Sequence, residues 1–153
     1  MKTERLPPKL RKLFAVAKKA RTNAYAPHSG CKVGAAIELA SGGIYPGCNV
    51  ENASYGGTVC AERGSIQTAI CAEGKIRIKQ ILVVTDASPP WLPCGLCRQV
   101  ISEFVANAPG GDIPIYSTNT KGEMIASTFL KLYPGLFSPA ELRKGQTQKA
   151  IRK

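Results

Sequence analysis

Apolar side chains recur every three to four residues in three stretches of the chain, and this spacing predicts three helices. The first follows Pro8 and should end near Asn23 to Pro27, because proline disfavours helical geometry in the residue before it. The second should begin at Thr58, whose hydroxyl can cap a helix and which follows two glycines. The third spans Cys94 to Ala106, behind a proline-rich loop.

Runs of β-branched and other apolar residues between these helices predict five strands. The first two flank the turn Ser41-Gly42-Gly43 and should form an antiparallel hairpin. The run Ile81-Leu82-Val83-Val84 is continuously apolar, as in a strand covered on both faces, so its strand should be central. The predicted strands are Cys31 to Ala40, Ile44 to Val50, Ile78 to Thr85, Ile113 to Ser117 and Met124 to Ala126. The order of elements predicts an α/β fold, a three-layer α/β/α sandwich around a mixed five-stranded sheet.

The length of 153 residues suits a single domain, which we expect over residues 1–142, followed by a basic, mobile tail over 143–153. Hydrophobic residues make up 44% and charged residues 20%, and no apolar run approaches the roughly 20 residues of a membrane span. The basic start lacks a continuous apolar region, so no secretory signal is predicted. We therefore expect a cytoplasmic protein with no membrane association.

The net charge of +11 is concentrated at the two ends of the chain. Residues 1–21 hold eight basic groups against one acidic group, and residues 141–153 hold five against one. The 119 residues between them carry eight of each and are neutral overall. Basic ends can attract a polyanion, but charge runs more often form a solvated helix face or a tail. Nucleic acid therefore stays open as a partner without being favoured.

Cys60, Cys94 and Cys97 have the pattern of a catalytic zinc site. Thiolates bind zinc tetrahedrally, and a catalytic site uses three protein ligands so that the fourth position can take water. A structural site would need a fourth ligand, and Cys60 has no second Cys or His close to it in sequence. Glu62 follows it instead, and its carboxylate can take protons from zinc-bound water. The combination predicts hydrolytic chemistry, with reduced cysteines as in other intracellular enzymes.

Two arginines, Arg63 and Arg98, stand close in sequence to the predicted ligands. Three thiolates around Zn²⁺ leave a net charge of −1, which makes the metal a weaker activator of water than neutral ligands would. We expect both guanidinium groups to donate to the sulfur atoms and draw charge off the metal.

These residues lie in sequence blocks that resemble the small cytidine deaminases, a three-cysteine variant of the zinc deaminases with their Pro-Cys-x-x-Cys signature. The similarity runs from about Asn23 to Leu142 and keeps the family's order of blocks. The blocks are Ala24-Tyr25-Ala26-Pro27 with Val33-Gly34-Ala35-Ala36, Gly47 to Ala53, Cys60 to Arg63, Pro93 to Gln99, and Leu132 to Pro139. The resemblance implies the cytidine deaminase-like version of the predicted sandwich.

The resemblance also implies a homotetramer with active sites shared between subunits. Its reaction would be hydrolysis of cytidine and deoxycytidine to uridine and deoxyuridine with release of ammonia, as in pyrimidine salvage. By match to the family, Asn49 and Glu51 bind the ribose 3′-hydroxyl, and the backbone of Ala61 holds the pyrimidine edge. Tyr55 and Phe137 match residues that reach the pocket of a neighbouring subunit.

The segment before the first strand departs from the family's usual Tyr-Ser-x-Phe-x-Val-Gly-Ala. Cys31 stands where a Phe would stack on the base, and loss of one stacking ring weakens binding by about 0.5 to 1.5 kcal/mol beyond the lost area, unless Phe137 or another ring compensates. His28, the sole histidine, is expected at the surface or in packing rather than on the metal. Trp91 precedes the second half of the zinc site, and it either lines the pocket or packs against its own domain.

Other functions share some of these features. A deaminase of RNA or single-stranded DNA would use the same zinc chemistry and the basic ends, but Asn49 and Glu51 are expected to hold a hydroxyl that a polynucleotide esterifies. A zinc-stabilised binding protein would carry the cysteines without turnover. A deaminase of a cytosine-containing antibiotic is closer in chemistry, but the block Asn49 to Ala53 fits the cytidine enzymes better.

Overall fold

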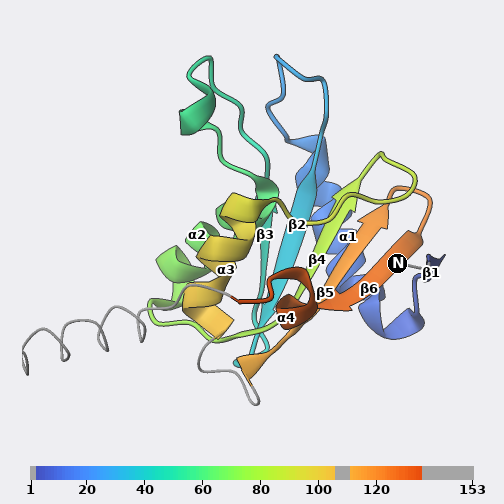
Figure 1. The fold of residues 1–153 in the computed structure, drawn as a ribbon, viewed down its shortest axis with the longest axis vertical. Coiled ribbons are helices and arrows are strands. Elements are labelled where there is room, and N and C mark those ends of the chain that lie inside the picture. Colours follow the sequence, from blue (N-terminus) through green and yellow to red (C-terminus); the bar gives the residue numbers. More distant parts are fainter. Residues whose placement is uncertain (1–2, 106–110, 136–153) are drawn as a thin grey trace, which may run out of the picture.

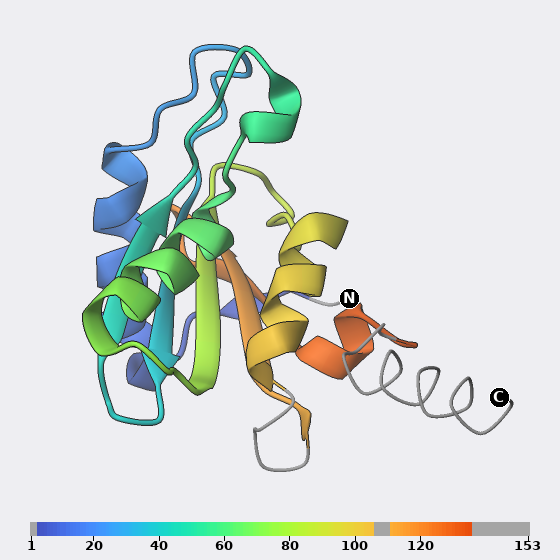
Figure 2. The same cartoon turned by 90° about the vertical axis from the view of Figure 1, so that its left-hand side faces the viewer.

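The computed structural model describes residues 3–105 and 111–135, drawn as a ribbon in Figures 1 and 2. Its helices are α1 (Arg11–Thr22), α2 (Ala61–Glu73), α3 (Gly95–Val105) and α4 (Phe129–Leu132), with short 3-10 turns η1 (Pro8–Leu10) and η2 (Tyr55–Gly57). Its strands are β1 (Glu4–Arg5), β2 (Gly34–Leu39), β3 (Ile44–Cys48), β4 (Ile78–Thr85), β5 (Pro114–Asn119) and β6 (Glu123–Thr128). No helix in these two ranges is long and apolar enough to cross a membrane.

The strands form one mixed sheet in the order β1-β6-β5-β4-β2-β3. β2 and β3 pair antiparallel, which confirms the predicted hairpin. β4 lies between β2 and β5, so the continuously apolar strand is central, as predicted. β4 and β5 run parallel, because α3 carries the chain back across the sheet between them.

The prediction of five strands was wrong by one, since the described residues contain six. The additional strand, β1, is two residues long and pairs antiparallel with β6, with Glu4 opposite Met124. Both of its residues are exposed. Apolar periodicity could not reveal it, because a short edge strand without a buried face carries no such pattern.

Helices cover both faces of the sheet, which confirms the three-layer arrangement (Figures 1 and 2). Neighbouring residues of β4 point to opposite faces, as the pleat of a strand requires. Leu82 packs with the α1 side chain Leu13 on one face. Val83 packs on the other face with Ile66 of α2 and Ile101 of α3. The continuous apolar run of β4 therefore contributes side chains to two hydrophobic cores, one on each face of the sheet.

Helix α2 begins three residues after the predicted start at Thr58. The Thr58 hydroxyl does not cap the helix but accepts a hydrogen bond from the backbone N–H of Asn52 at 3.2 Å. Val59 pairs with Val50 in an isolated bridge, which keeps this part of the chain extended. The helix therefore starts at Ala61, with Cys60 in the N-cap position.

The start of α2 packs backbone against backbone on β3. A side-chain carbon added at Gly47 would overlap the backbone nitrogen of Ser65 and the carbonyl oxygen of Ala61. The absence of a side chain at this position thus brings the first turn of α2 against the sheet. That turn carries Glu62 and directly follows Cys60.

Candidate active site

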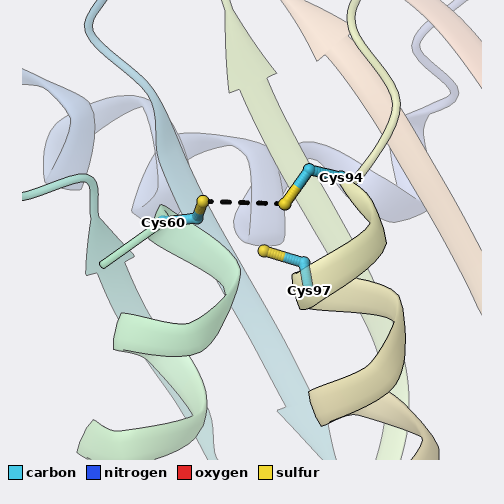
Figure 3. Close-up of side chains that lie close together, drawn as sticks. All are labelled: Cys60, Cys94 and Cys97. Atoms are coloured by element: carbon cyan, nitrogen blue, oxygen red, sulfur yellow. Dashed lines mark hydrogen bonds between the residues drawn. The ribbon is translucent and has the colours of Figure 1, made fainter. Parts of the chain in front are cut away.

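The three cysteines predicted to bind zinc come together between the first turns of α2 and α3 (Figure 3). Cys60 is the N-cap of α2, Cys94 directly precedes α3, and Cys97 lies in the first turn of α3. Their side chains point toward one another from the two helices, as Figure 3 shows. The two halves of the motif are 34 residues apart in sequence and meet because both helices begin at the same end of the sheet.

The spacing of the sulfur atoms fits a tetrahedral zinc ion. All three Sγ atoms lie within 4.8 Å of one another, and those of Cys60 and Cys94 are 3.8 Å apart. Two ligands on a tetrahedral centre with Zn–S bonds near 2.3 Å are about 3.8 Å apart. In the described parts of the chain this is the one group of three or more metal-binding side chains, and no fourth ligand joins it. The donor set therefore fits zinc with an open coordination position.

The thiol groups are already partly prepared to bind a cation. The pKa of Cys60 is lowered to about 5, chiefly because Cys97 donates a hydrogen bond to its sulfur, with Cys94 and Arg63 adding to the effect. The pKa of Cys97 is raised, because its proton is held by the Cys60 sulfur and its surroundings are buried. Because thiolates rather than thiols bind zinc, metal binding would release the thiol protons of the cluster.

Glu62 is a buried carboxylic acid beside this cluster. Its side chain is 5% exposed, and burial raises its pKa to about 7. The negative charge on Cys60 adds to the increase, whereas its own backbone N–H and the thiol of Cys97 oppose it. A carboxyl group with this pKa can both accept and release a proton near neutral pH.

The two arginines near the cluster have different surroundings. Arg63 lies close enough to Cys60 to lower the pKa of that thiol, and it donates from Nη2 to the carbonyl oxygen of Thr58. Its buried Nε has no hydrogen-bond partner among the described residues. Arg98 donates from Nε to the carbonyl of Pro93 and from Nη1 to that of Leu132, both at 2.7 Å. Those bonds hold the loop that carries Cys94, and donation from Arg98 to sulfur stays a prediction.

Asn49 is buried directly after β3 and holds the opposite wall of the site. Its Oδ1 accepts a hydrogen bond from the backbone N–H of Val33 at 2.8 Å, and its Nδ2 donates to the carbonyl of Cys31 at 2.9 Å. The amide thereby fixes the segment that leads into β2. One N–H of Nδ2 remains for another acceptor.

Glu51 ties down the neighbouring turn. Its Oε2 accepts from the backbone N–H groups of His28 and Ser29 at 2.8 and 3.1 Å, and its Oε1 accepts from the hydroxyl of Ser29. The hydrogen bond from the Ser29 hydroxyl is the main cause that lowers the pKa of Glu51. The group is therefore a carboxylate near neutral pH, with lone pairs left to accept one further hydrogen bond.

Two adjoining cavities connect these residues. One, of about 210 Å³, is lined by Cys60, Cys94, Glu62, Ala61, Asn49 and Cys31 among others. The second, of about 330 Å³, is lined by His28, Ser29, Glu51, Tyr55 and Thr58. Ser29 and Thr58 lie in the walls of both, so the cavities share a boundary. A flat ring beside the metal position and an attached sugar would need two connected spaces of this kind.

Most of the predicted site residues therefore gather in one place. Tyr55 is 79% exposed on η2, at the rim of the second cavity, and its ring makes an edge contact with His28. Phe137 lies outside the described residues. Sequence reasoning missed Ser29 and Thr58 as parts of the pocket wall, because no spacing relative to the cysteine motif marks them.

Comparisons with known proteins agree with this chemistry. Residues 7–108 match the family model of the cytidine and deoxycytidylate deaminase zinc-binding region. The cytidine deaminase of Sporosarcina psychrophila is 47% identical over 131 residues, which cover 86% of this chain and 93% of that protein. The cytidine deaminase of Halalkalibacterium halodurans is 39% identical over 130 residues, which cover 85% and 95%.

Solved structures are similar over the same region. The crystal structure of cytidine deaminase from Burkholderia pseudomallei matches with a TM-score of 0.75 and 39% identity, covering 82% of this chain and 97% of that one. The crystal structure of cytidine deaminase from Mycobacterium tuberculosis matches with a TM-score of 0.70 and 30% identity, covering 86% and 99%.

Proposed function

This chain belongs to the cytidine deaminase family, and from that premise we propose that it hydrolyses cytidine and deoxycytidine to uridine and deoxyuridine with release of ammonia. The enzyme is a zinc-dependent cytidine deaminase, and its place in metabolism would be pyrimidine salvage. The observation that carries the assignment is the buried Glu62 beside three sulfur atoms within 4.8 Å of one another.

The chemistry divides between the metal and one carboxylate. Zinc bound by Cys60, Cys94 and Cys97 would supply Lewis-acid activation of a water molecule. Glu62 takes a proton from the attacking water and delivers one to the ring nitrogen N3. It then takes the second proton of the same water, from the new hydroxyl group on C4, and delivers it to the departing amino group, so that cytidine and water become uridine and ammonia. Arg63 would offset part of the negative charge of the thiolates.

The second cavity would take the sugar. Asn49 keeps one free N–H and Glu51 keeps one accepting position, and a 3′-hydroxyl can accept from the first and donate to the second. Ala61, the first residue of α2, has a backbone N–H without an intrahelical partner, which supports the proposal that it holds the pyrimidine edge. A nucleoside should thus bind better than a free base.

Asn49 and Glu51 should also select nucleosides over polynucleotides. A phosphate ester at the 3′ position cannot donate to Glu51 and adds negative charge beside a carboxylate. RNA and single-stranded DNA should therefore be poor substrates, although α1 exposes Lys12, Lys18 and Lys19. Salt-sensitive binding of an oligonucleotide together with its deamination would favour the polynucleotide alternative.

We further propose that the enzyme works as a homotetramer with shared active sites. A groove of about 690 Å³ between α1, β3 and α2 is lined largely by small and apolar side chains, including Cys48, Val50 and Val59. The segments 23–33 and 49–60 project beyond the sheet and helices in Figures 1 and 2, and Tyr55 stands exposed on the second. A second copy of the chain would cover both features.

Sedimentation would reveal the assembly, and the variant Tyr55→Ala would test whether a neighbour depends on this ring. Tetramers with weakened cytidine binding in Tyr55→Ala would support the shared site, whereas an active monomer would contradict it.

All six cysteines are free, which supports a reducing location such as the cytoplasm.

The central test combines zinc content and cytidine turnover in wild type and Glu62→Gln. The variant keeps the size of the side chain but cannot carry protons, so zinc should be retained while kcat falls by about 10² to 10⁴. Glu103→Gln, a change on the exposed surface of α3, serves as the matched control. Wild-type protein without zinc, or full activity in Glu62→Gln, would contradict the function.

A further inference from the structure

The cavity beside the zinc ligands contains one aromatic side chain among the described residues, Trp91. It lies in the loop between β4 and α3, three residues before Cys94. The same cavity is lined by Cys31, Val33 and Leu92, none of which offers a flat surface. Among the described residues of its own subunit, Trp91 is therefore the ring on which a planar base in this space could stack.

Trp91 is also more exposed than packing alone would favour. The side chain is 50% exposed, although it is the largest apolar side chain in the chain and borders a cavity. Tryptophan contributes most when its faces are covered by another flat group. The open part of the indole is thus surface that a ligand in the cavity can bury.

The loop that carries Trp91 has a restricted backbone. Pro90 and Pro93, on either side of it, are both buried, and proline restricts the backbone at each point. Leu92 packs against the main core. The carbonyl of Pro93 accepts the hydrogen bond from Arg98 at 2.7 Å. Little backbone entropy would therefore be lost from this loop when a ligand covers the ring.

We propose that Trp91 is the wall on which the pyrimidine ring of the substrate stacks, and that it determines base affinity in place of an aromatic residue at position 31. The proposal rests on the cytidine deaminase function above and names the contact that function requires. Cys31 lies in the same cavity wall, but its thiol is small and lies 3.6 Å from the carbonyl oxygen of Ser29. Stacking is therefore assigned to the α3 side of the pocket.

Steady-state kinetics of two variants provide the first test. Trp91→Ala should raise KM for cytidine about tenfold, with a smaller change in kcat, because stacking contributes to binding more than to proton transfer. Trp91→Phe keeps a flat ring and should stay within about threefold of wild type. Leu130→Ala, which truncates a 40% exposed side chain that does not line the cavity, is the control and should change neither constant.

Fluorescence gives a second test that does not depend on a variant folding. Trp91 is the sole tryptophan, so the intrinsic indole emission of the wild type comes from this position alone. Uridine, the reaction product, should quench that emission saturably, with a midpoint equal to its inhibition constant for cytidine turnover. An unchanged KM in an active Trp91→Ala enzyme, or no change in emission at saturating uridine, would overturn the proposal. Absence of cytidine turnover in the wild type would instead overturn the function on which it rests.

Discussion

The side-chain amide of Asn49 is bound to the backbone of Cys31, where Nδ2 donates to the carbonyl oxygen at 2.9 Å. With its second bond, from the N–H of Val33, the buried amide fixes one wall of the pocket before any ligand arrives. Asn49 therefore has a structural task in addition to its proposed contact with the sugar.

Replacement of Asn49 by alanine should affect both tasks. Two partly buried backbone groups would lose their partner, at a cost of about 1 to 3 kcal/mol of unfolding free energy. That loss corresponds to a decrease in Tm of several degrees, on the order of 2 to 4 °C per kcal/mol. Cytidine KM should rise as well. Asn52→Ala removes an exposed amide that bonds only to its local turn and should leave Tm and KM nearly unchanged. Equal Tm in both variants would contradict the structural role of Asn49.

Gly47 should tolerate no side chain. The methyl group of Gly47→Ala would overlap backbone atoms of Ala61 and Ser65, which cannot move independently of α2. We expect a destabilisation of about 1 to 3 kcal/mol and a loss of bound zinc, because Cys60 and Glu62 lie in the displaced turn. Gly56→Ala is the control, since a side chain there meets nothing within 4 Å. Thermal unfolding with zinc analysis would detect the difference, and identical behaviour of the two variants would refute the close packing.

Arg63→Gln should weaken zinc binding. The guanidinium faces Cys60 and lowers the pKa of that thiol, so its loss leaves three thiolates less compensated. Groups that contact metal ligands typically contribute about 10- to 100-fold in metal affinity or activity. Competition with a chelator would measure the change, and the exposed Arg77→Gln should show none. Wild-type affinity in Arg63→Gln would rule out this role.

The stability of the turn at His28 and Ser29 should decrease at acid pH. The pKa of Glu51 is lowered from its ordinary value of 4.5, chiefly by the hydrogen bond from the Ser29 hydroxyl. A carboxyl group with a lowered pKa in the folded state stabilises it above the unfolded pKa and loses that effect as the pH falls through the folded value. Backbone N–H groups of His28 and Ser29 should thus be protected from hydrogen exchange near neutral pH and lose protection as the pH falls through the lowered pKa of Glu51.

Glu51→Gln separates this effect from general acid unfolding. The variant has no carboxyl group to titrate, so the protection of His28 and Ser29 relative to the rest of the chain should be independent of pH. If wild type and variant lost protection in parallel, Glu51 would not be the group responsible.

Periodicity predicted the elements that have a buried face. The apolar run of β4 and the turn Ser41-Gly42-Gly43 carried enough information to place the central strand and its neighbouring hairpin. β1 escaped prediction because a two-residue exposed strand gains its pairing from β6, which is more than a hundred residues away. The predicted helix start at Thr58 was wrong because the Thr58 hydroxyl accepts a hydrogen bond from the backbone of Asn52 instead of capping the helix.

The metal site was predictable from sequence spacing, since Cys60, the pair Cys94 and Cys97, and the adjacent Glu62 restrict the chemistry strongly. The remaining pocket was less accessible to such reasoning. Asn49 and Glu51 could be named by resemblance, but their bonds to the backbone of 28–33 depend on how two distant loops meet. The position of Trp91 in the wall likewise required the path of the loop before α3.

A metal that links the start of α2 to the start of α3 would also contribute to folding stability. Cys60 and Cys94 are 34 residues apart, and the chain between them includes α2 and the central strand β4. A zinc ion that joins their sulfur atoms closes a covalent loop around the middle of the sheet and reduces the freedom of the unfolded chain. Because only the folded chain brings the ligands together, each factor of ten in metal affinity also adds about 1.4 kcal/mol to folding. The ion that would activate water would therefore also stabilise the fold around β4, and the free energy of unfolding would depend on the supply of zinc.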